Sequence, residues 1–216
     1  MREIYRALAG ALSVFAVVSQ CYLTLHDRSG AALATEAIRF FSFFTIQTNI
    51  LVAAAYVVPL VAPHSAAARF LLRPSVRTAL VGYIIVVGVV FYVLLSDLGA
   101  PSGARLFFER VLHYVIPPLF VLDWLFFVPK GETHWRVGLD ALGFPAAYAA
   151  WTLAHGAVSG WYPYPFLDVA DLGYAQALIN IAGLVLAFLA LELALVVIDR
   201  ILWLLGRPAA ADPPPT

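Results

Sequence analysis

Short segments rich in charge, proline and glycine divide the chain into six long apolar stretches. The stretches are roughly residues 5–25, 38–62, 77–96, 107–128, 137–157 and 175–203, and each reaches the ~20 residues that a helix needs to cross the hydrocarbon layer. Lipid offers the backbone no hydrogen-bond partner, and the stretches lack the alternation of barrel strands. The sequence therefore predicts an all-α fold, a polytopic membrane bundle of six transmembrane helices.

Composition supports this class and excludes others. Hydrophobic residues make up 62% of the 216 residues and charged residues 12%, about half the charged fraction of soluble domains. The net charge is zero and the basic residues form no patch, so we expect no nucleic acid partner. The single cysteine, Cys21, excludes an intrachain disulfide and a cysteine metal site, and we expect no metal and no cofactor.

The distribution of basic residues predicts the orientation. With six alternating spans, nine of the thirteen Lys and Arg residues lie on the side of the N-terminus and four on the opposite side. The positive-inside rule then places both termini in the cytoplasm, and the composition, rich in Ala, Val and Leu, favours a bacterial plasma membrane. We expect one transmembrane domain over residues 1–206 and a disordered, proline-rich tail over residues 207–216.

Polar residues inside the spans are candidate functional residues, because each costs free energy unless it is paired or faces a cavity. In the second span, Ser42, Thr45 and Asn49 follow the spacing of one helical face, and Thr48 lies one turn from Thr45. A single membrane threonine is more often structural, since its hydroxyl commonly bonds the carbonyl one turn back. The pattern indicates that this face points at protein and not at lipid.

The fourth span contains a histidine between two acidic residues. Glu109 lies one turn before His113, so its carboxylate could orient the ring and hold its tautomer. Asp123 lies ~15 Å further along the helix axis, too deep to touch His113. The alternative for His113 is a structural hydrogen bond between helices.

Depth arguments bring several of these residues together. Thr45 and His113 lie ~9 Å and ~12 Å below the outer-side arginines of their spans, and Asn180 in the sixth span reaches the same level. We therefore predict that Thr45, Asn49, His113 and Asn180 line one pocket that opens to the outer side. The aromatic loop at residues 159–168 either lies over its mouth or forms an interfacial aromatic belt.

The motifs of soluble hydrolases are missing from the sequence. It contains no Gly-x-Ser-x-Gly elbow, no His-Glu-x-x-His and no glycine-rich phosphate loop. Hydrolytic chemistry would therefore need another nucleophile. A threonine hydroxyl is available, and it needs a base such as histidine to remove its proton.

Three local segments resemble the androgen-induced integral membrane protein family. They are Phe43-Phe44-Thr45-Ile46, the segment 113–120 (His-Tyr-Val-Ile-Pro-Pro-Leu-Phe) with Asp123, and Ser159-Gly160 followed by the segment 164–168 (Tyr-Pro-Phe-Leu-Asp). Members of that family hydrolyse fatty acid esters of hydroxy fatty acids with an intramembrane threonine and a histidine. The resemblance covers nearly the whole chain as a six-helix plan, and it implies Thr45 as nucleophile and His113 as base. The segment after Thr45 is more polar than in animal members, which makes Thr48 a rival nucleophile.

The sequence thus predicts an intramembrane hydrolase of long-chain acyl-lipid esters, with a lipid ester as substrate and membrane lipids around it. Thr45 would attack the ester, His113 would carry the proton, and Glu109 or a water would orient His113. Asn49 and Asn180 are the candidate oxyanion donors. The alternatives are a non-catalytic lipid-binding or transport protein that uses the same cavity, and a structural bundle that binds a partner protein.

Overall fold

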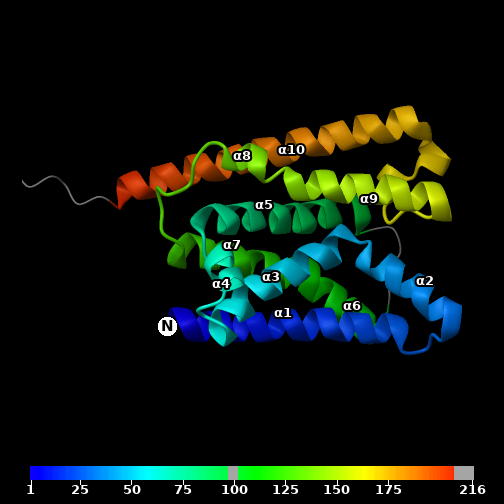
Figure 1. Cartoon of the computed structure of the whole chain (residues 1–216), viewed down its shortest axis with the longest axis horizontal. Coiled ribbons are helices and arrows are strands. Elements are labelled where there is room, and N and C mark those ends of the chain that lie inside the picture. Colours follow the sequence, from blue (N-terminus) through cyan, green and yellow to red (C-terminus); the bar gives the residue numbers. More distant parts are fainter. Residues whose placement is uncertain (97–101, 207–216) are drawn as a thin grey trace, which may run out of the picture.

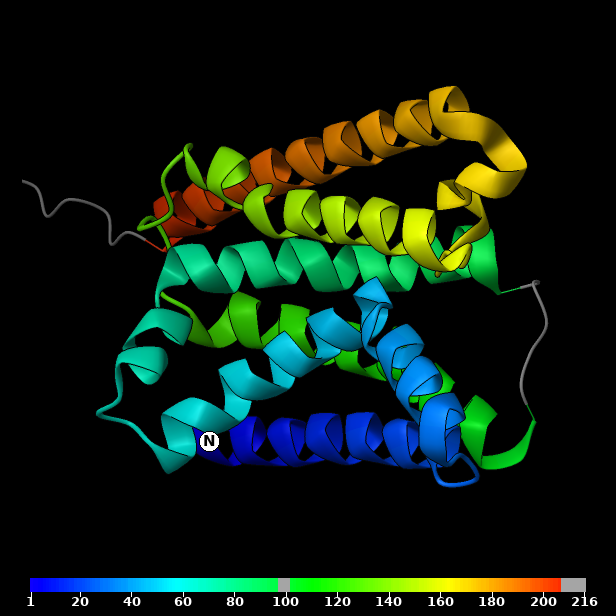
Figure 2. The ribbon, with the colours of Figure 1, turned by 45° about the vertical axis from the view of Figure 1, so that its right-hand side comes forward.

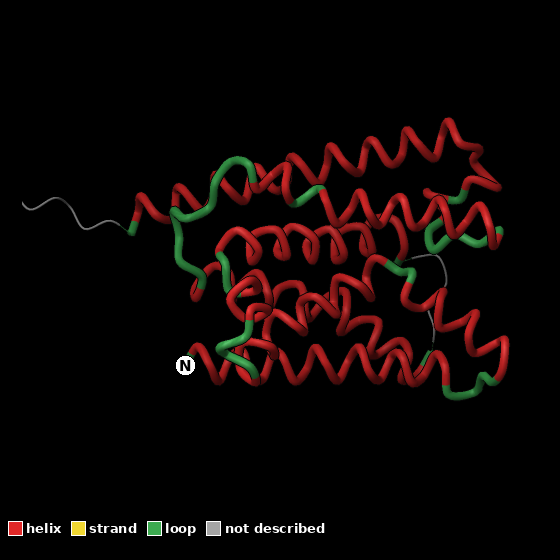
Figure 3. Tube along the Cα trace, in the orientation of Figure 1, coloured by secondary structure: helices red, strands yellow, loops and turns green. Residues whose placement is uncertain are grey.

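The computed structural model describes residues 1–96 and 102–206, in which all regular structure is helical (Figures 1 and 3). In chain order the helices are α1 (Arg2–Leu25), α2 (Gly30–Phe41), α3 (Phe44–Val61), α4 (Ala66–Leu71), α5 (Pro74–Val90), η1 (Phe91–Leu95), α6 (Gly103–Arg110), η2 (Val111–Val115), α7 (Ile116–Phe127), α8 (Val137–Asp140), α9 (Gly143–Ser159), η3 (Pro165–Leu167) and α10 (Val169–Leu205). The predicted tail at 207–216 lies outside the described residues.

Five of these helices are long and apolar enough to cross a membrane, as expected of an integral membrane protein. They are α1, α3, α5 with η1, the continuous stretch α6–η2–α7, and α10. The predicted fifth span is divided between the short helix α8 and the 17-residue helix α9, which is at the lower limit of length for a crossing. The described residues thus confirm the all-α class with five membrane-length helices, one fewer than the six predicted.

Helix α3 lies at the centre of one half of the bundle. It packs against α1 and α5, and α5 in turn packs against α7 and α10. The contact with α1 is close because Gly10 has no side chain: a Cβ there would lie 3.0 Å from the Cβ of the fully buried Tyr56. Small residues let membrane helices approach in this way. Figure 2 shows α9 and α10 on the opposite side of α5 from α1.

The second predicted span begins later than expected, because the chain turns between α2 and α3. Ser42 ends α2, donates its hydroxyl hydrogen to the carbonyl of Ile38 (2.7 Å) and accepts from the indole of Trp151 (3.0 Å). Phe43 is extended, and α3 starts at the next residue. The predicted common face of Ser42 with Thr45 is therefore wrong, and the turn places Thr45 in the first turn of α3.

A buried ionic cluster ties three helices together at the end of the bundle that holds the N-terminus. Asp123 on α7 accepts from Arg6 on α1 (2.7 and 3.1 Å) and from Arg77 on α5 (2.9 Å). Arg77 is fully buried and also donates to the carbonyl of Ala55 on α3 (2.6 Å). Asp123 was a candidate supporting residue of the site, although too deep to touch His113 itself. It instead pairs with arginines, and its role is to hold the fold.

We predict that Asp123→Asn lowers the free energy of unfolding by about 3–5 kcal/mol, because it leaves two buried guanidinium groups without their counter-charge. Thermal melting of the detergent-solubilised protein measures this loss. The control is Asp140→Asn, because Asp140 is exposed. Equal melting temperatures for the two variants would contradict a stabilising role for the cluster.

Candidate active site

The turn before α3 leaves main-chain donors at the start of that helix without acceptors inside the helix. The N-cap residue Phe43 supplies no side-chain cap, and the amide of Gln47 is the first to bond the carbonyl of Phe43 (3.1 Å). The amide hydrogens of Phe44, Thr45 and Ile46 therefore have no acceptor within the helix. They point out of the helix end, where the macrodipole favours negative charge.

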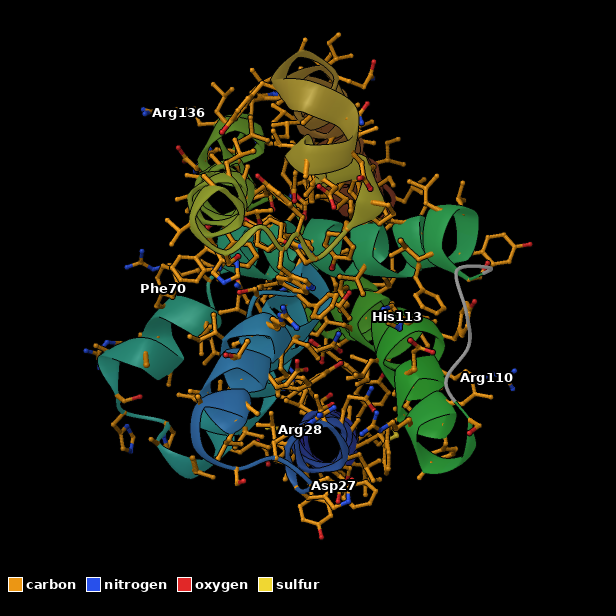
Figure 4. The ribbon with its side chains drawn as sticks, turned by 90° about the vertical axis from the view of Figure 1, so that its right-hand side faces the viewer. Asp27, Arg28, Phe70, Arg110, His113 and Arg136 are labelled. Atoms are coloured by element: carbon orange, nitrogen blue, oxygen red, sulfur yellow. The ribbon has the colours of Figure 1, made fainter. Side chains whose placement is uncertain are left out.

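His113 lies in a π-helical turn, η2, between α6 and α7. Its ring stacks on Phe91, the first residue of a second π-helical turn on α5, with 3.7 Å between ring centroids. A Cβ on Gly88 would lie 3.1 Å from the carbonyl oxygen of His113, so α5 approaches this turn closely. π-Helical turns inside α-helices are rare and occur frequently at functional sites. Figure 4 looks onto this end of the bundle, with His113 between the helices and Arg110 pointing outward.

The hydroxyl of Thr45 and the ring of His113 face each other. Thr45 Oγ1 lies 3.3 Å from His113 Nε2, and both residues are buried, with 7% and 8% of their surface exposed. The other ring nitrogen, Nδ1, lies 2.8 Å from the carbonyl oxygen of Glu109. A carbonyl only accepts, so Nδ1 carries the hydrogen of the neutral ring and Nε2 presents a lone pair to the threonine. This is the arrangement of a nucleophile and its base, at a separation typical of an enzyme without substrate.

Tyr164 completes the cluster from a loop that follows α9. Its hydroxyl lies 3.4 Å from both the hydroxyl and the amide nitrogen of Thr45. Burial raises the pKa of Tyr164 above that of an ordinary phenol, so the hydroxyl keeps its proton at neutral pH and can donate it in a hydrogen bond. The loop is held by Asn180 on α10, whose side-chain amide donates to the carbonyl of Phe166 (2.9 Å).

A cavity of about 520 Å³ reaches this cluster. We call it the polar cavity because charged and amide side chains interrupt its aromatic walls. It is lined by Gln20, Thr24, Glu36, Arg39, Phe40, Phe43, Thr45, Ile46, Phe91, Leu95, Glu109, Leu112, His113, Trp161, Pro163, Tyr164 and Pro165. Arg39 is paired with Glu36 (3.1 Å) and lies over the ring of Trp161, 5.4 Å from its centre.

A second, much narrower space adjoins Thr45 on the side of α5, α9 and α10. Its volume is about 60 Å³, and we call it the apolar crevice. It is lined by Phe44, Thr45, Val86, Val87, Val90, Leu95, Pro145, Tyr148, Ala149, Tyr164, Phe166, Leu167, Ile181, Leu184, Val185 and Phe188. Thr45 and Tyr164 line both spaces, so the candidate nucleophile lies at their junction.

Two predicted site residues lie together, whereas Glu109 acts differently from the expectation. Thr45 and His113 are in contact, as the depth argument predicted. Glu109 fixes the ring of His113 through its main-chain carbonyl and not through its carboxylate, which lines the polar cavity. The expected carboxylate contact is therefore wrong, because the i, i+4 geometry of the helix presents a carbonyl to Nδ1.

Thr48 and Asn49, which lie about one turn after Thr45 on α3, do not line the polar cavity. Asn49 uses its amide hydrogens on the carbonyls of Thr45 (2.9 Å) and Leu112 (3.5 Å), so it is not free to act as an oxyanion donor. It instead ties α3 to η2. Thr48 is fully buried, and its hydroxyl makes no hydrogen bond within the described part of the chain. The Thr48 hydroxyl is thus not hydrogen-bonded to His113, whereas that of Thr45 is, and this favours Thr45 as the candidate nucleophile.

Asn180 also fails as an oxyanion donor, because its amide group is used in anchoring the loop and it lines neither space. Two contacts were missed by sequence reasoning. Tyr164 was expected only as part of an aromatic belt or lid, and nothing marked Phe91 as the ring beneath His113. The segment 164–168 is one of the three that carry the family resemblance, and this was the signal that could have marked Tyr164 as a site residue.

Comparisons of the chain with models of protein families, with curated proteins and with solved structures find no match. The resemblance noted in the sequence therefore stays a prediction. The geometry of Thr45, His113 and Tyr164 is the basis for a functional proposal.

Proposed function

We propose that the protein is an intramembrane hydrolase of long-chain acyl-lipid esters with Thr45 as nucleophile and His113 as general base. The observation that carries the proposal is the fixed tautomer of His113, which directs a ring lone pair at the Thr45 hydroxyl, 3.3 Å away. Bases of this kind contribute typically 10²–10⁴-fold to a rate.

In the first half-reaction, the oxygen of Thr45 attacks the ester carbonyl and its proton moves to Nε2 of His113. The negative charge then develops on the carbonyl oxygen. The amide hydrogen of Ile46, which has no acceptor within the helix, and the hydroxyl of Tyr164, which accepts from the amide of Thr45 (3.4 Å), are the candidate donors to this oxygen, in place of the expected Asn49 and Asn180. Donors held in place before the reaction stabilise such charge strongly in a site that excludes water.

The surroundings favour an apolar ester as the substrate. Five helices are of membrane length, the cluster is buried among them, and one of the two spaces at Thr45 is almost entirely apolar. A lipid ester would enter from the bilayer, and water would reach the polar cavity from the membrane surface. The sequence resemblance adds fatty acid esters of hydroxy fatty acids as the specific candidate class.

The labelling experiment uses a fluorophosphonate carrying an alkyl chain, which captures an activated hydroxyl covalently. We expect labelling of the wild-type protein and none of Thr45→Ala. His113→Ala should lower ester hydrolysis by roughly 10²–10⁴-fold, and Thr45→Ser should retain part of the activity because it keeps the hydroxyl. Thr48→Ala is the matched control on the same helix, and it should label like the wild type.

The outcomes separate the competing functions once circular dichroism shows that the variants are folded. Labelling lost in Thr48→Ala and kept in Thr45→Ala would move the nucleophile to Thr48. Labelling kept in both variants would refute the threonine mechanism and favour the lipid-binding alternative.

Tyr164→Phe tests the oxyanion donor. It removes one hydroxyl and keeps the ring, so we expect kcat to fall on the order of 10²-fold while the melting temperature stays close to that of the wild type. Tyr162→Phe on the same loop is the control and should keep its rate. An unchanged kcat in Tyr164→Phe would reduce Tyr164 to a packing residue.

We further propose that α9 is a sixth span and that the Thr45 end of the bundle faces away from the cytoplasm. The nine-to-four distribution of basic residues supports both points.

Single cysteines in a Cys21→Ser background test the topology in intact cells, because Ala67, Glu132 and Ala170 are exposed. A membrane-impermeant maleimide should react with Ala170→Cys from outside, and with Ala67→Cys and Glu132→Cys only after permeabilisation. Reaction of Glu132→Cys and Ala170→Cys from the same side would show that α9 does not cross. Inverted labelling of all three positions would reverse the orientation.

A further inference from the structure

The two spaces that meet at Thr45 differ in their access to the base. His113 lines the polar cavity and does not line the apolar crevice. Thr45, which carries the reacting oxygen, lines both spaces. This asymmetry constrains how an ester can lie across the site.

Hydrolysis requires that both the leaving alcohol and the attacking water reach Nε2 of His113. When the tetrahedral intermediate collapses, the bond between the carbonyl carbon and the alcohol oxygen breaks, and that oxygen takes the proton from His113 Nε2. In the second half-reaction, a water gives a proton to the same Nε2 and its oxygen attacks the acyl carbon. The bond to Thr45 Oγ1 then breaks, and Oγ1 recovers the proton. Of the two spaces that meet at Thr45, only the polar cavity is also lined by His113, so it is the one that can hold both the alcohol and the water.

We propose that the apolar crevice is the acyl subsite, which takes the first methylene groups of the fatty acyl chain next to the ester carbonyl, and that the polar cavity takes the alcohol part of the ester. This assignment rests on the proposed hydrolase function and adds which part of the ester binds in which of the two spaces. The crevice offers no charged side chain and its lining is almost entirely apolar, so it suits a methylene chain better than a polar headgroup. The acyl carbonyl would then lie at Thr45, beside Tyr164.

Phe188 contributes an aromatic ring to the lining of the crevice. Phe188 on α10 packs against Phe44 and Tyr83, with ring centroids 5.6 and 6.2 Å apart. From Ile181 to Phe188, the α10 wall extends ~10 Å along the helix. In this assignment Phe188 is the floor of the acyl subsite, because its ring is held by Phe44 and Tyr83 at the end of the α10 wall.

The test measures kcat/KM for p-nitrophenyl acetate and p-nitrophenyl decanoate, which share the alcohol and differ in acyl length. In the wild type, each methylene that enters the crevice should raise kcat/KM about fourfold. Val185→Trp fills the crevice, so the decanoate-to-acetate ratio should fall by at least about tenfold. Leu186→Trp is the control, because Leu186 is 65% exposed on the outside of the same helix and should keep the wild-type ratio.

Two further variants keep the test decisive if Val185→Trp melts at a low temperature. Phe188→Ala removes the floor and should shift the preferred ester towards chains longer than decanoate. Thr24→Trp, in the polar cavity, should lower the rates of both esters alike, since they share one alcohol. A decanoate-specific loss in Thr24→Trp, with an unchanged ratio in Val185→Trp, would mean the opposite direction of binding and overturn the assignment.

Failure of the subsite and failure of the function give different results. If the wild type hydrolyses neither ester and takes up no fluorophosphonate, the hydrolase itself is refuted and the subsite with it. If both esters are hydrolysed but the ratio is the same in the wild type, Val185→Trp, Phe188→Ala and Leu186→Trp, the hydrolase stands and the acyl subsite is refuted.

Discussion

The interior of a membrane offers no water to polar groups, and the structure is organised around this constraint. Helices pair most backbone N–H and C=O groups internally. A helix end inside the bundle therefore costs free energy unless its unpaired groups find other hydrogen-bond partners. The turn at Ser42 and Phe43 creates such an end in front of Thr45. One of the amide hydrogens that lack a helical acceptor there, that of Thr45, donates to the hydroxyl of Tyr164. The same unsatisfied donors make the helix end suited to bind a developing negative charge.

Polar groups gather at two separate places in the bundle, with opposite consequences. At the end with the N-terminus, Asp123 and its two arginines are closely paired, and little of their hydrogen-bonding capacity is left for a ligand. Near the other end, Thr45, His113 and Tyr164 are held at longer distances beside a cavity. The first cluster fixes the relative positions of α1, α5 and α7. The second cluster is built on α3, on η2 and on the loop before α10. The first cluster holds α7, which directly follows η2, and α5, which packs against α3.

The parts of the molecule that depend on local pattern could be predicted from the sequence. Apolar runs predicted all five membrane-length helices to within six residues at each end, and rise per residue put Thr45 and His113 at similar depth. Contacts between residues far apart in the chain could not be predicted. Tyr164 lies 119 residues from Thr45, and Asp123 lies 117 residues from Arg6. The errors at Glu109 and Asn49 share one cause: spacing along a helix shows which residues are neighbours, but not whether a side chain or a main-chain carbonyl supplies the contact.

The π-helical turn at His113 bears on how such a site can arise. A π-helical turn closes its hydrogen bond one residue later than an α-helical turn, so it is equivalent to one inserted residue in an otherwise regular helix. Removing one residue from Val111–Val115 would restore a continuous α-helix and rotate one flank by ~100° relative to the other. The helix would still cross the bundle, but the imidazole could no longer face both Phe91 and the hydroxyl of Thr45. Loss of a single codon at this turn would therefore be enough to separate the imidazole of His113 from the hydroxyl of Thr45 without breaking the helix.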